Sequence, residues 1–169
     1  LIAVEKLTQS FQIFSEKHAS LIKVGRTHLE DAVPITLGQE FSAYATMLEK
    51  SSRRISEYSK ELLEIGLGGT ALGTGITTHP QYQKKVVAAL AKLTRLPLKP
   101  ANNLFETTSS MNVFVALSGA CRMLAIDLTK IANDLKLLNM GPLAGIAEIT
   151  LPEVEPGSSI MPGKVNPSV

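Results

Sequence analysis

Residues 39–67, QEFSAYATMLEKSSRRISEYSKELLEIGL, decide the fold because they run without proline and are rich in Ala, Glu, Lys, Leu and Met. Their apolar side chains line one face of a helix: Met47, Leu48, Ile55, Leu62 and Ile65. At ~1.5 Å per residue this helix would extend ~40 Å, which is unusual in a small globular domain. Such a length is typical of a helical bundle.

Three more helices are predicted along the chain. Residues 1–23 carry apolar side chains at helical spacing, and Gly25 is expected to end this helix. A shorter helix is predicted at 80–96 and another long one at 106–139. Period-two alternation, the pattern of strands, is almost absent outside 149–154. The predicted fold class is therefore all-α, with long and roughly antiparallel helices.

Glycine and proline mark the segments between these helices. Residues 24–39 hold Gly25, Pro34 and Gly38 and are expected to form a loop that carries polar side chains between two helices. Residues 66–80, with five glycines, break the second helix. Apolar stripes on helices this long exceed what one short chain can cover, so we expect an oligomeric bundle. A monomer of three or four helices is the alternative.

The composition limits the function classes. The chain has 169 residues, 44% hydrophobic and 19% charged, with a net charge of +2, which fits one folded domain. No basic run with interleaved aromatics predicts nucleic-acid binding, and no unbroken apolar stretch predicts a membrane span. Cys121 has no second cysteine to pair with, and no signal peptide is recognisable. We therefore expect a cytoplasmic protein, and the mid-helix start suggests a piece of a longer chain.

Familiar nucleotide and metal motifs fit poorly. The glycine run at 66–75 follows a long helix, whereas a dinucleotide fingerprint follows a strand. GSSIMPGKV has the wrong spacing for a phosphate-binding loop, and Val165 stands where that motif needs Ser or Thr. The histidines, at positions 18, 28 and 79, match no metal spacing. No metal site and no cofactor are predicted.

Two polar segments remain as candidates for chemistry. The first offers Arg26, Thr27, His28, Glu30 and Asp31, and the second offers Ser158, Ser159, Lys164 and Asn166. Together they supply hydroxyls, an imidazole, an ammonium and an amide, which suit a small anionic substrate and proton transfer. The alternatives are ordinary structural roles: a capping histidine, a solvated loop lysine and turn serines.

The sequence resembles the aspartase/fumarase superfamily over essentially its whole length. GSSIMPGKVNP matches the signature loop of that superfamily, which we place at 156–167, and GRTHLEDAVPITLGQE resembles its second characteristic region. GGTALGTG and KIANDLKLL also match family segments. The resemblance implies that 1–169 is the central helical domain of a lyase subunit, and that the lyase is a homotetramer whose active sites are each shared between three subunits.

The resemblance also implies a reaction and residue roles. The reaction would be a reversible anti elimination that releases fumarate from a C4 dicarboxylate. Ser158, the first serine of GSS, would be the base that removes the proton from carbon 3, and His28 would also take part in catalysis. Thr27 and His28 would bind one end of the substrate, and Lys164 and Asn166 would hold the other carboxylate.

By the same resemblance, the leaving group would be ammonia or water. GGTALGTG, THPQY and PEVEPGSS are similar to fumarase sequences, whereas FETTSSMN and the Ser168–Val169 ending are closer to aspartase. We expect aspartate ammonia-lyase, with class II fumarate hydratase as the alternative. A non-catalytic helical oligomerisation module is the alternative from another class.

Overall fold

The structure is a computed structural model that describes residues 1–155, 157–161, 164, 166 and 167. Its contacts divide the chain into two compact units, Leu1–Met123 and Leu124–Val169. The boundary falls within helix α5, Asn112–Leu138. About half of the chain is helical, and its described strands form only small two-stranded sheets, which confirms the all-α prediction.

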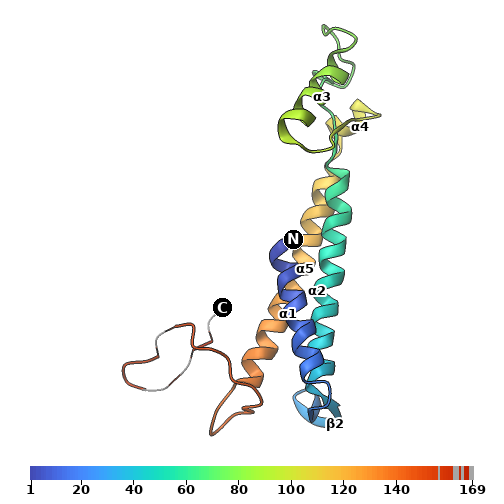
Figure 1. Cartoon of the computed structure of the whole chain (residues 1–169). Coiled ribbons are helices and arrows are strands. Elements are labelled where there is room, and N and C mark those ends of the chain that lie inside the picture. The colour runs from blue at the N-terminus through green and yellow to red at the C-terminus, as the bar shows by residue number, and fades with distance from the viewer. Residues whose placement is uncertain (156, 162–163, 165, 168–169) are drawn as a thin grey trace. The chain divides into compact units, whose positions relative to one another are not determined.

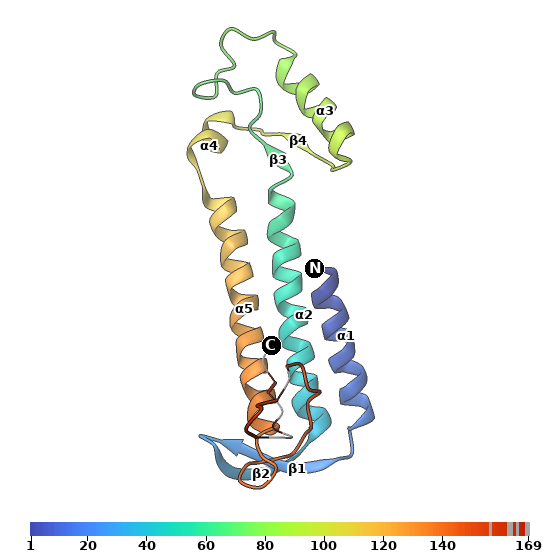
Figure 2. The same cartoon turned by 90° about the vertical axis from the view of Figure 1, so that its left-hand side faces the viewer.

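The centre of the first unit is a pair of helices, α1 (Ile2–Lys17) and α2 (Leu37–Glu61), which pack side by side (Figures 1 and 2). An aromatic cluster fills their interface: Phe14 lies 4.2 Å and Phe11 5.6 Å from Phe41 between ring centroids. The Tyr44 ring meets the Phe41 ring edge to face, with 5.4 Å between centroids, and Tyr44 is 1% exposed. Burial of such large rings supplies most of the stabilisation between the two helices.

The adjoining ends of α1 and α2 are tied together by hydrogen bonds. The Ser15 hydroxyl donates to the Gly38 carbonyl at 2.7 Å, and the Gly38 N–H donates to the His18 carbonyl at 3.0 Å. A Cβ at Gly38 would lie 2.5 Å from the Ser15 carbonyl oxygen, so only glycine permits this approach.

A capping box begins α2. Thr36 accepts a hydrogen bond from the Gln39 N–H at 3.1 Å, and the Gln39 side chain accepts from the Thr36 N–H at 2.9 Å. These two bonds satisfy donors that the first turn of a helix leaves open.

Shorter elements lie beyond the other end of α2 (Figure 2). Strand β3 (Glu64–Ile65) pairs in parallel with β4 (Lys99–Pro100), and α3 (Tyr82–Thr94) packs against β4. Helix α4 (Leu104–Ser109) is capped by the Asn103 side chain, which accepts from the Phe105 and Glu106 N–H groups. The glycine segment 66–80 folds against this helix. Gly73 has φ of +123°, and a Cβ at this position would lie 2.8 Å from the Phe105 backbone nitrogen.

In the second unit the chain folds back over the C-terminal end of α5. The Glu148 N–H donates to the Leu138 carbonyl at 2.9 Å, and the Leu151 N–H donates to the Asn139 side chain at 2.8 Å. The first bond satisfies a backbone carbonyl that the end of a helix leaves without an intrahelical donor, and the second ties the returning chain to a side chain just beyond the helix.

Helix α5 is apolar and largely uncovered within this chain. Among the described residues it is the one helix long and apolar enough to cross a membrane by length and composition, and only 6% of its apolar window is buried. The helices of a soluble bundle meet the same criteria. Phe114, Val115 and Ile126 are all more than half exposed.

Four sequence predictions were wrong in detail. The helix predicted at 39–67 ends at Glu61, since the chain leaves the helix before strand β3 at Glu64–Ile65. The first helix ends at Lys17, not near residue 23, and 24–39 is not a loop, since most of it forms a β-hairpin. The helix predicted at 106–139 is two helices, separated at Ser110, whose backbone is extended. Hydroxyls before the break bond back to the helix, as Thr108 does to the Leu104 carbonyl at 2.6 Å, and such bonds compete with helical ones.

Candidate functional site

The first candidate segment is a β-hairpin at the end of the α1–α2 pair (Figure 2). Strand β1 (Ile22–Thr27) pairs antiparallel with β2 (Glu30–Thr36), so that Thr27 lies opposite Glu30. His28 and Leu29 form the two-residue turn, with φ of 54° and 66°. Positive φ at both central residues is the pattern of a type I′ turn, which matches the twist of the strands. Thr27 and His28 are therefore adjacent and exposed at the tip.

Gly25 shapes the hairpin below this tip. The register is irregular between Val24 and Arg26, so Gly25 lies in a bulge. A Cβ there would lie 2.7 Å from the Val33 carbonyl oxygen. Pro34 lies beside the bulge, opposite Val24, where a strand tolerates a residue without an N–H group.

Charged pairs brace the hairpin at two levels. Near the tip, Arg26 Nε lies 3.8 Å from Asp31 Oδ1 across the two strands. Near the base, Lys23 Nζ lies 2.6 Å from Glu40 Oε2 in the first turn of α2. The Lys23 side chain is only 9% exposed, whereas Asp31 is 82% exposed, so solvent screens the base pair much less than the tip pair.

The second candidate segment, 156–167, is a loop closed by one β-bridge in which Glu155 pairs with Asn166. Within it, the Ile160 N–H donates to the Ser158 hydroxyl oxygen at 3.2 Å. The Gly157 N–H donates to the Glu153 carboxylate at 3.1 Å. Lys164 is exposed, and Ser158 and Asn166 are half-buried. The bridge therefore brings Ser158, Lys164 and Asn166 into one loop.

The predicted residues thus form two groups, one in each unit. Thr27 and His28 share the hairpin tip of the first unit, while Ser158, Ser159, Lys164 and Asn166 share the loop of the second. Pro156, Pro162, Gly163 and Val165 of the signature loop lie outside the described residues, as do Ser168 and Val169. Among the described residues, no group of three or more His, Cys, Asp or Glu side chains could hold a metal ion.

Sequence reasoning missed the residues that support these groups. Glu153 and the Lys23–Glu40 pair carry no motif, because their partners are identified only once the chain is folded. A weak signal exists for Glu40, which stands four positions after the capping Thr36, since acidic residues favour the first turn of a helix.

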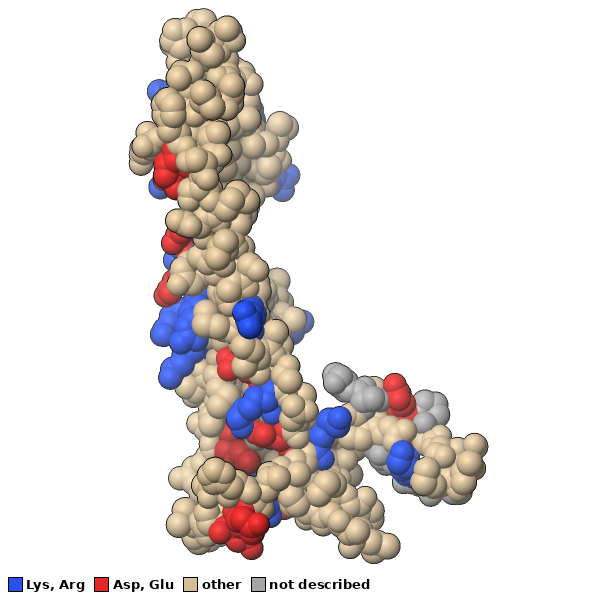
Figure 3. Space-filling view, turned by 180° about the vertical axis from the view of Figure 1, so that it is seen from behind, with Lys and Arg blue, Asp and Glu red and all other residues tan. Residues whose placement is uncertain are grey.

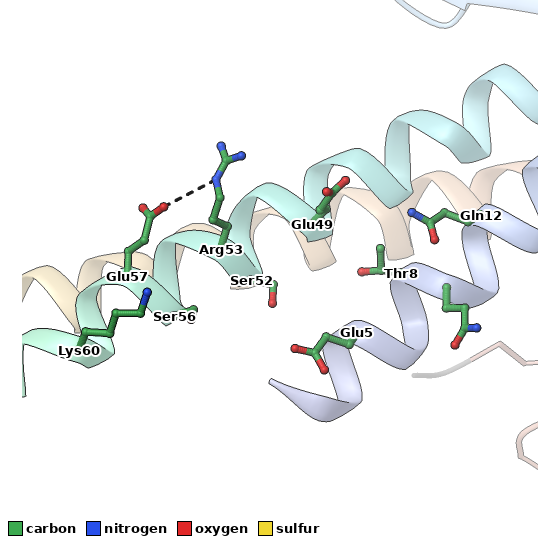
Figure 4. Close-up of a pocket in the computed structure, with 10 residues that line it drawn as sticks. Glu5, Thr8, Gln12, Glu49, Ser52, Arg53, Ser56, Glu57 and Lys60 are labelled. Atoms are coloured by element: carbon green, nitrogen blue, oxygen red, sulfur yellow. Dashed lines mark ion pairs between the residues drawn. The ribbon is translucent and has the colours of Figure 1, made fainter. Parts of the chain in front are cut away.

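A shallow groove of about 430 Å³, lined by polar and charged residues, lies between α1 and α2 (Figure 4). Glu5 and Thr8 face it from α1, and Glu49, Arg53 and Lys60 from α2. Arg53 pairs with Glu57 at 3.9 Å, and both side chains are exposed. None of the predicted site residues lines this groove. Figure 3 shows Lys and Arg interspersed with Asp and Glu on one face of the molecule, a mixed surface.

Comparison with known proteins identifies the class. The model of a protein family described as Lyase matches residues 1–169. The aspartate ammonia-lyase of Pseudomonas aeruginosa is 52% identical over 170 residues, which cover 100% of this chain and 36% of that protein. The class II fumarate hydratase of Neisseria meningitidis serogroup A is 49% identical over 166 residues, which cover 98% of this chain and 36% of that protein.

Solved structures agree. The fumarate lyase:delta crystallin of Brucella melitensis bound to cobalt matches with a TM-score of 0.92 at 46% identity, over 98% of this chain and 36% of that one. A recombinant class II fumarase from Schistosoma mansoni matches with a TM-score of 0.92 at 35% identity, over 97% of this chain and 37% of that one. The chain belongs to this lyase family, which confirms the resemblance seen in the sequence. It spans about a third of the length of the relatives it matches.

Proposed function

We propose that the protein containing this chain is a lyase that converts L-aspartate to fumarate and ammonia by anti elimination. The observation that carries the proposal is the hydrogen bond from the Ile160 N–H to the Ser158 oxygen, within a loop that also holds Lys164 and Asn166. A serine hydroxyl is a weak base, and a backbone N–H aimed at its oxygen favours the ionised form.

In the proposed reaction, the Ser158 alkoxide takes the proton from carbon 3 of the substrate. The electron pair of the broken C–H bond moves into the adjacent carboxylate, which becomes an enolate-like dianion. This electron pair then forms the double bond between carbons 2 and 3 as the bond between carbon 2 and nitrogen breaks. Ammonia departs with the electron pair of the broken carbon–nitrogen bond. Ser158 keeps the proton until it passes to solvent.

Lys164 and Asn166 have the chemistry to hold the carboxylate on which charge develops. The interactions of an ammonium and an amide N–H with a carboxylate become stronger as the negative charge on that carboxylate grows. These groups therefore stabilise the transition state more than the ground state. Thr27 and His28 would bind the other end of the substrate, with His28 also serving in proton transfer. Their exposed position at a tight turn suits a group that enters a site formed with another subunit.

We propose that the enzyme is a cytoplasmic homotetramer with active sites shared between subunits. The apolar, uncovered surface of α5 supports this, because the exposed side chains of Phe114, Val115 and Ile126 would be removed from water by packing against partner helices. The Lys130–Asp134 ion pair and Arg122 on the same helix favour a protein partner over a lipid bilayer.

The second candidate is class II fumarate hydratase, in which water is the leaving group. The segments GGTALGTG and THPQY favour it, whereas FETTSSMN favours the ammonia-lyase. The proton abstraction and the roles of the loop residues would be the same. Only the groups around the departing atom would differ.

The test uses the full-length protein with L-aspartate and L-malate in separate cuvettes, following the ultraviolet absorbance of fumarate. We expect fumarate from L-aspartate. Fumarate from L-malate alone would establish the hydratase instead, and fumarate from neither would favour the non-catalytic module. The variant Ser158→Ala should lower turnover by about 10³-fold or more, while the adjacent Ser159→Ala should retain most of it. Near-normal turnover in Ser158→Ala would refute the assignment of the base.

A further inference from the structure

We propose that the Lys23–Glu40 ion pair is a positioning device that fixes the direction of the β1–β2 hairpin on α2 and thereby places Thr27 and His28 for reaction. The proposal rests on the proposed function for its effect on turnover. The claim that the pair fixes the direction of the hairpin does not depend on that function and can be tested without substrate.

The two strands of the hairpin are attached to the helices in different ways. Strand β2 ends at Thr36, and α2 begins at the next residue, so this strand is continuous with the helix. Strand β1 follows a short connection from α1, whose Leu21 carbonyl accepts from the Leu37 N–H at 2.9 Å. Beyond that base, Lys23 links β1 to Glu40 on α2. With both strands attached to one helix, the plane of the hairpin is fixed.

The geometry of the pair suits this role better than that of an ordinary surface ion pair. Lys23 Nζ and Glu40 Oε2 are 2.6 Å apart, and their side chains are 9% and 22% exposed. Removal of Lys23 takes the ammonium away from the half-buried Glu40 carboxylate, and removal of Glu40 takes away the 2.6 Å contact that joins β1 to α2, so the position of β1 on the helix must shift. The exposed Arg53–Glu57 pair on the same helix, at 3.9 Å, has no such consequence.

A small shift at the base becomes a larger one at the tip. Thr27 lies four residues beyond Lys23 along β1, or about 13 Å at ~3.3 Å per residue. A rotation of about 5° at Lys23 therefore moves Thr27 by about 1 Å, and a misplacement of about 1 Å can lower a rate by about 10²-fold. The pair acts through Thr27 and His28 and does not itself touch the substrate.

The test compares Glu40→Gln and Lys23→Met with two controls in the full-length protein. Lys23→Arg keeps the charge, and Glu57→Gln makes the same chemical change in the exposed pair of α2. We expect Glu40→Gln and Lys23→Met to lower kcat/KM by about tenfold or more, with kcat falling as well as KM rising. Both controls should stay within about threefold of the parent.

A second measurement reports the hairpin itself. Spin labels at Leu29→Cys and Lys50→Cys, in a Cys121→Ser background, give the distance from the tip to α2. Glu40→Gln should shift or broaden this distance distribution, whereas Glu57→Gln should leave it unchanged. An unchanged distribution, or a lower melting temperature with unaltered kcat/KM, would overturn the proposal. If the parent protein had no lyase activity, the proposed function would be refuted. The distance distribution would then still show whether the Lys23–Glu40 pair fixes the direction of the hairpin.

Discussion

Gly157 and Lys164 approach each other so closely that a Cβ on residue 157 would lie 2.7 Å from the Lys164 carbonyl oxygen. The contact joins the two sides of the signature loop between the bridge residues Glu155 and Asn166. It explains why a glycine precedes the proposed base: any side chain at 157 would push against the backbone of Lys164, which carries the ammonium.

Gly157→Ala should therefore lower kcat/KM by about 10²-fold, because Ser158 and Lys164 would no longer keep their spacing. The helical circular dichroism signal should not change, since the loop lies outside the helices. Ser159→Ala, at an exposed position in the same loop, is the control. Parent-like steady-state kinetics in Gly157→Ala would contradict this account of the loop.

Lys164→Met should lower kcat more than it raises KM, with a fall in kcat of about 10² to 10³-fold. The ammonium is proposed to meet a carboxylate whose negative charge grows during proton removal, so its effect is greatest in the transition state. Steady-state kinetics with Lys164→Arg as the control separates charge from shape. A rise in KM at constant kcat would show that Lys164 binds substrate and transition state equally.

Thr36→Ala should lower the free energy of unfolding by about 1 kcal/mol, because it removes the cap that accepts from the Gln39 N–H. Urea denaturation measures the change. Thr46→Ala, within the same helix and exposed, is the control and should be neutral or slightly stabilising, since alanine has the higher helix propensity. Equal destabilisation by both variants would argue against a capping role.

Gly38→Ala should lower the free energy of unfolding by about 1 to 3 kcal/mol, because the new methyl group would force α1 away from α2. The added carbon would lie 2.5 Å from the Ser15 carbonyl oxygen, a backbone atom that cannot move independently. Thermal unfolding followed by circular dichroism provides the measurement. A melting temperature equal to that of the parent would mean that the helix pair can open at this point without cost.

The long helices could be predicted from the sequence because periodicity and propensity agree over many residues. Helix α3, at Tyr82–Thr94, falls close to its predicted range, whereas helix α2, at Leu37–Glu61, begins close to the prediction but ends six residues before it. The hairpin could not be predicted in this way. Its strands are mostly exposed and therefore lack a buried alternating face, and the bulge at Gly25 and the proline at 34 read as loop signals.

The candidate site was predictable to the extent that it lies within contiguous motifs. Thr27 and His28 are neighbours in the sequence and stay neighbours at the turn, and the loop residues lie within one short segment. Supporting contacts such as Gly157 N–H to Glu153 join residues of ordinary type. Nothing in their spacing distinguishes them from solvated side chains, so only the folded structure reveals them.

The bonds that join Leu37 to Leu21 and Gly38 to His18 close the helix pair beneath the hairpin. The helix pair is thus closed without residues 22–35, and those residues form an appendage whose length and tip can vary while the helices keep their packing. We expect that replacement of residues 22–35 by a tight connector yields a protein that still folds and, under the proposed function, has lost its lyase activity.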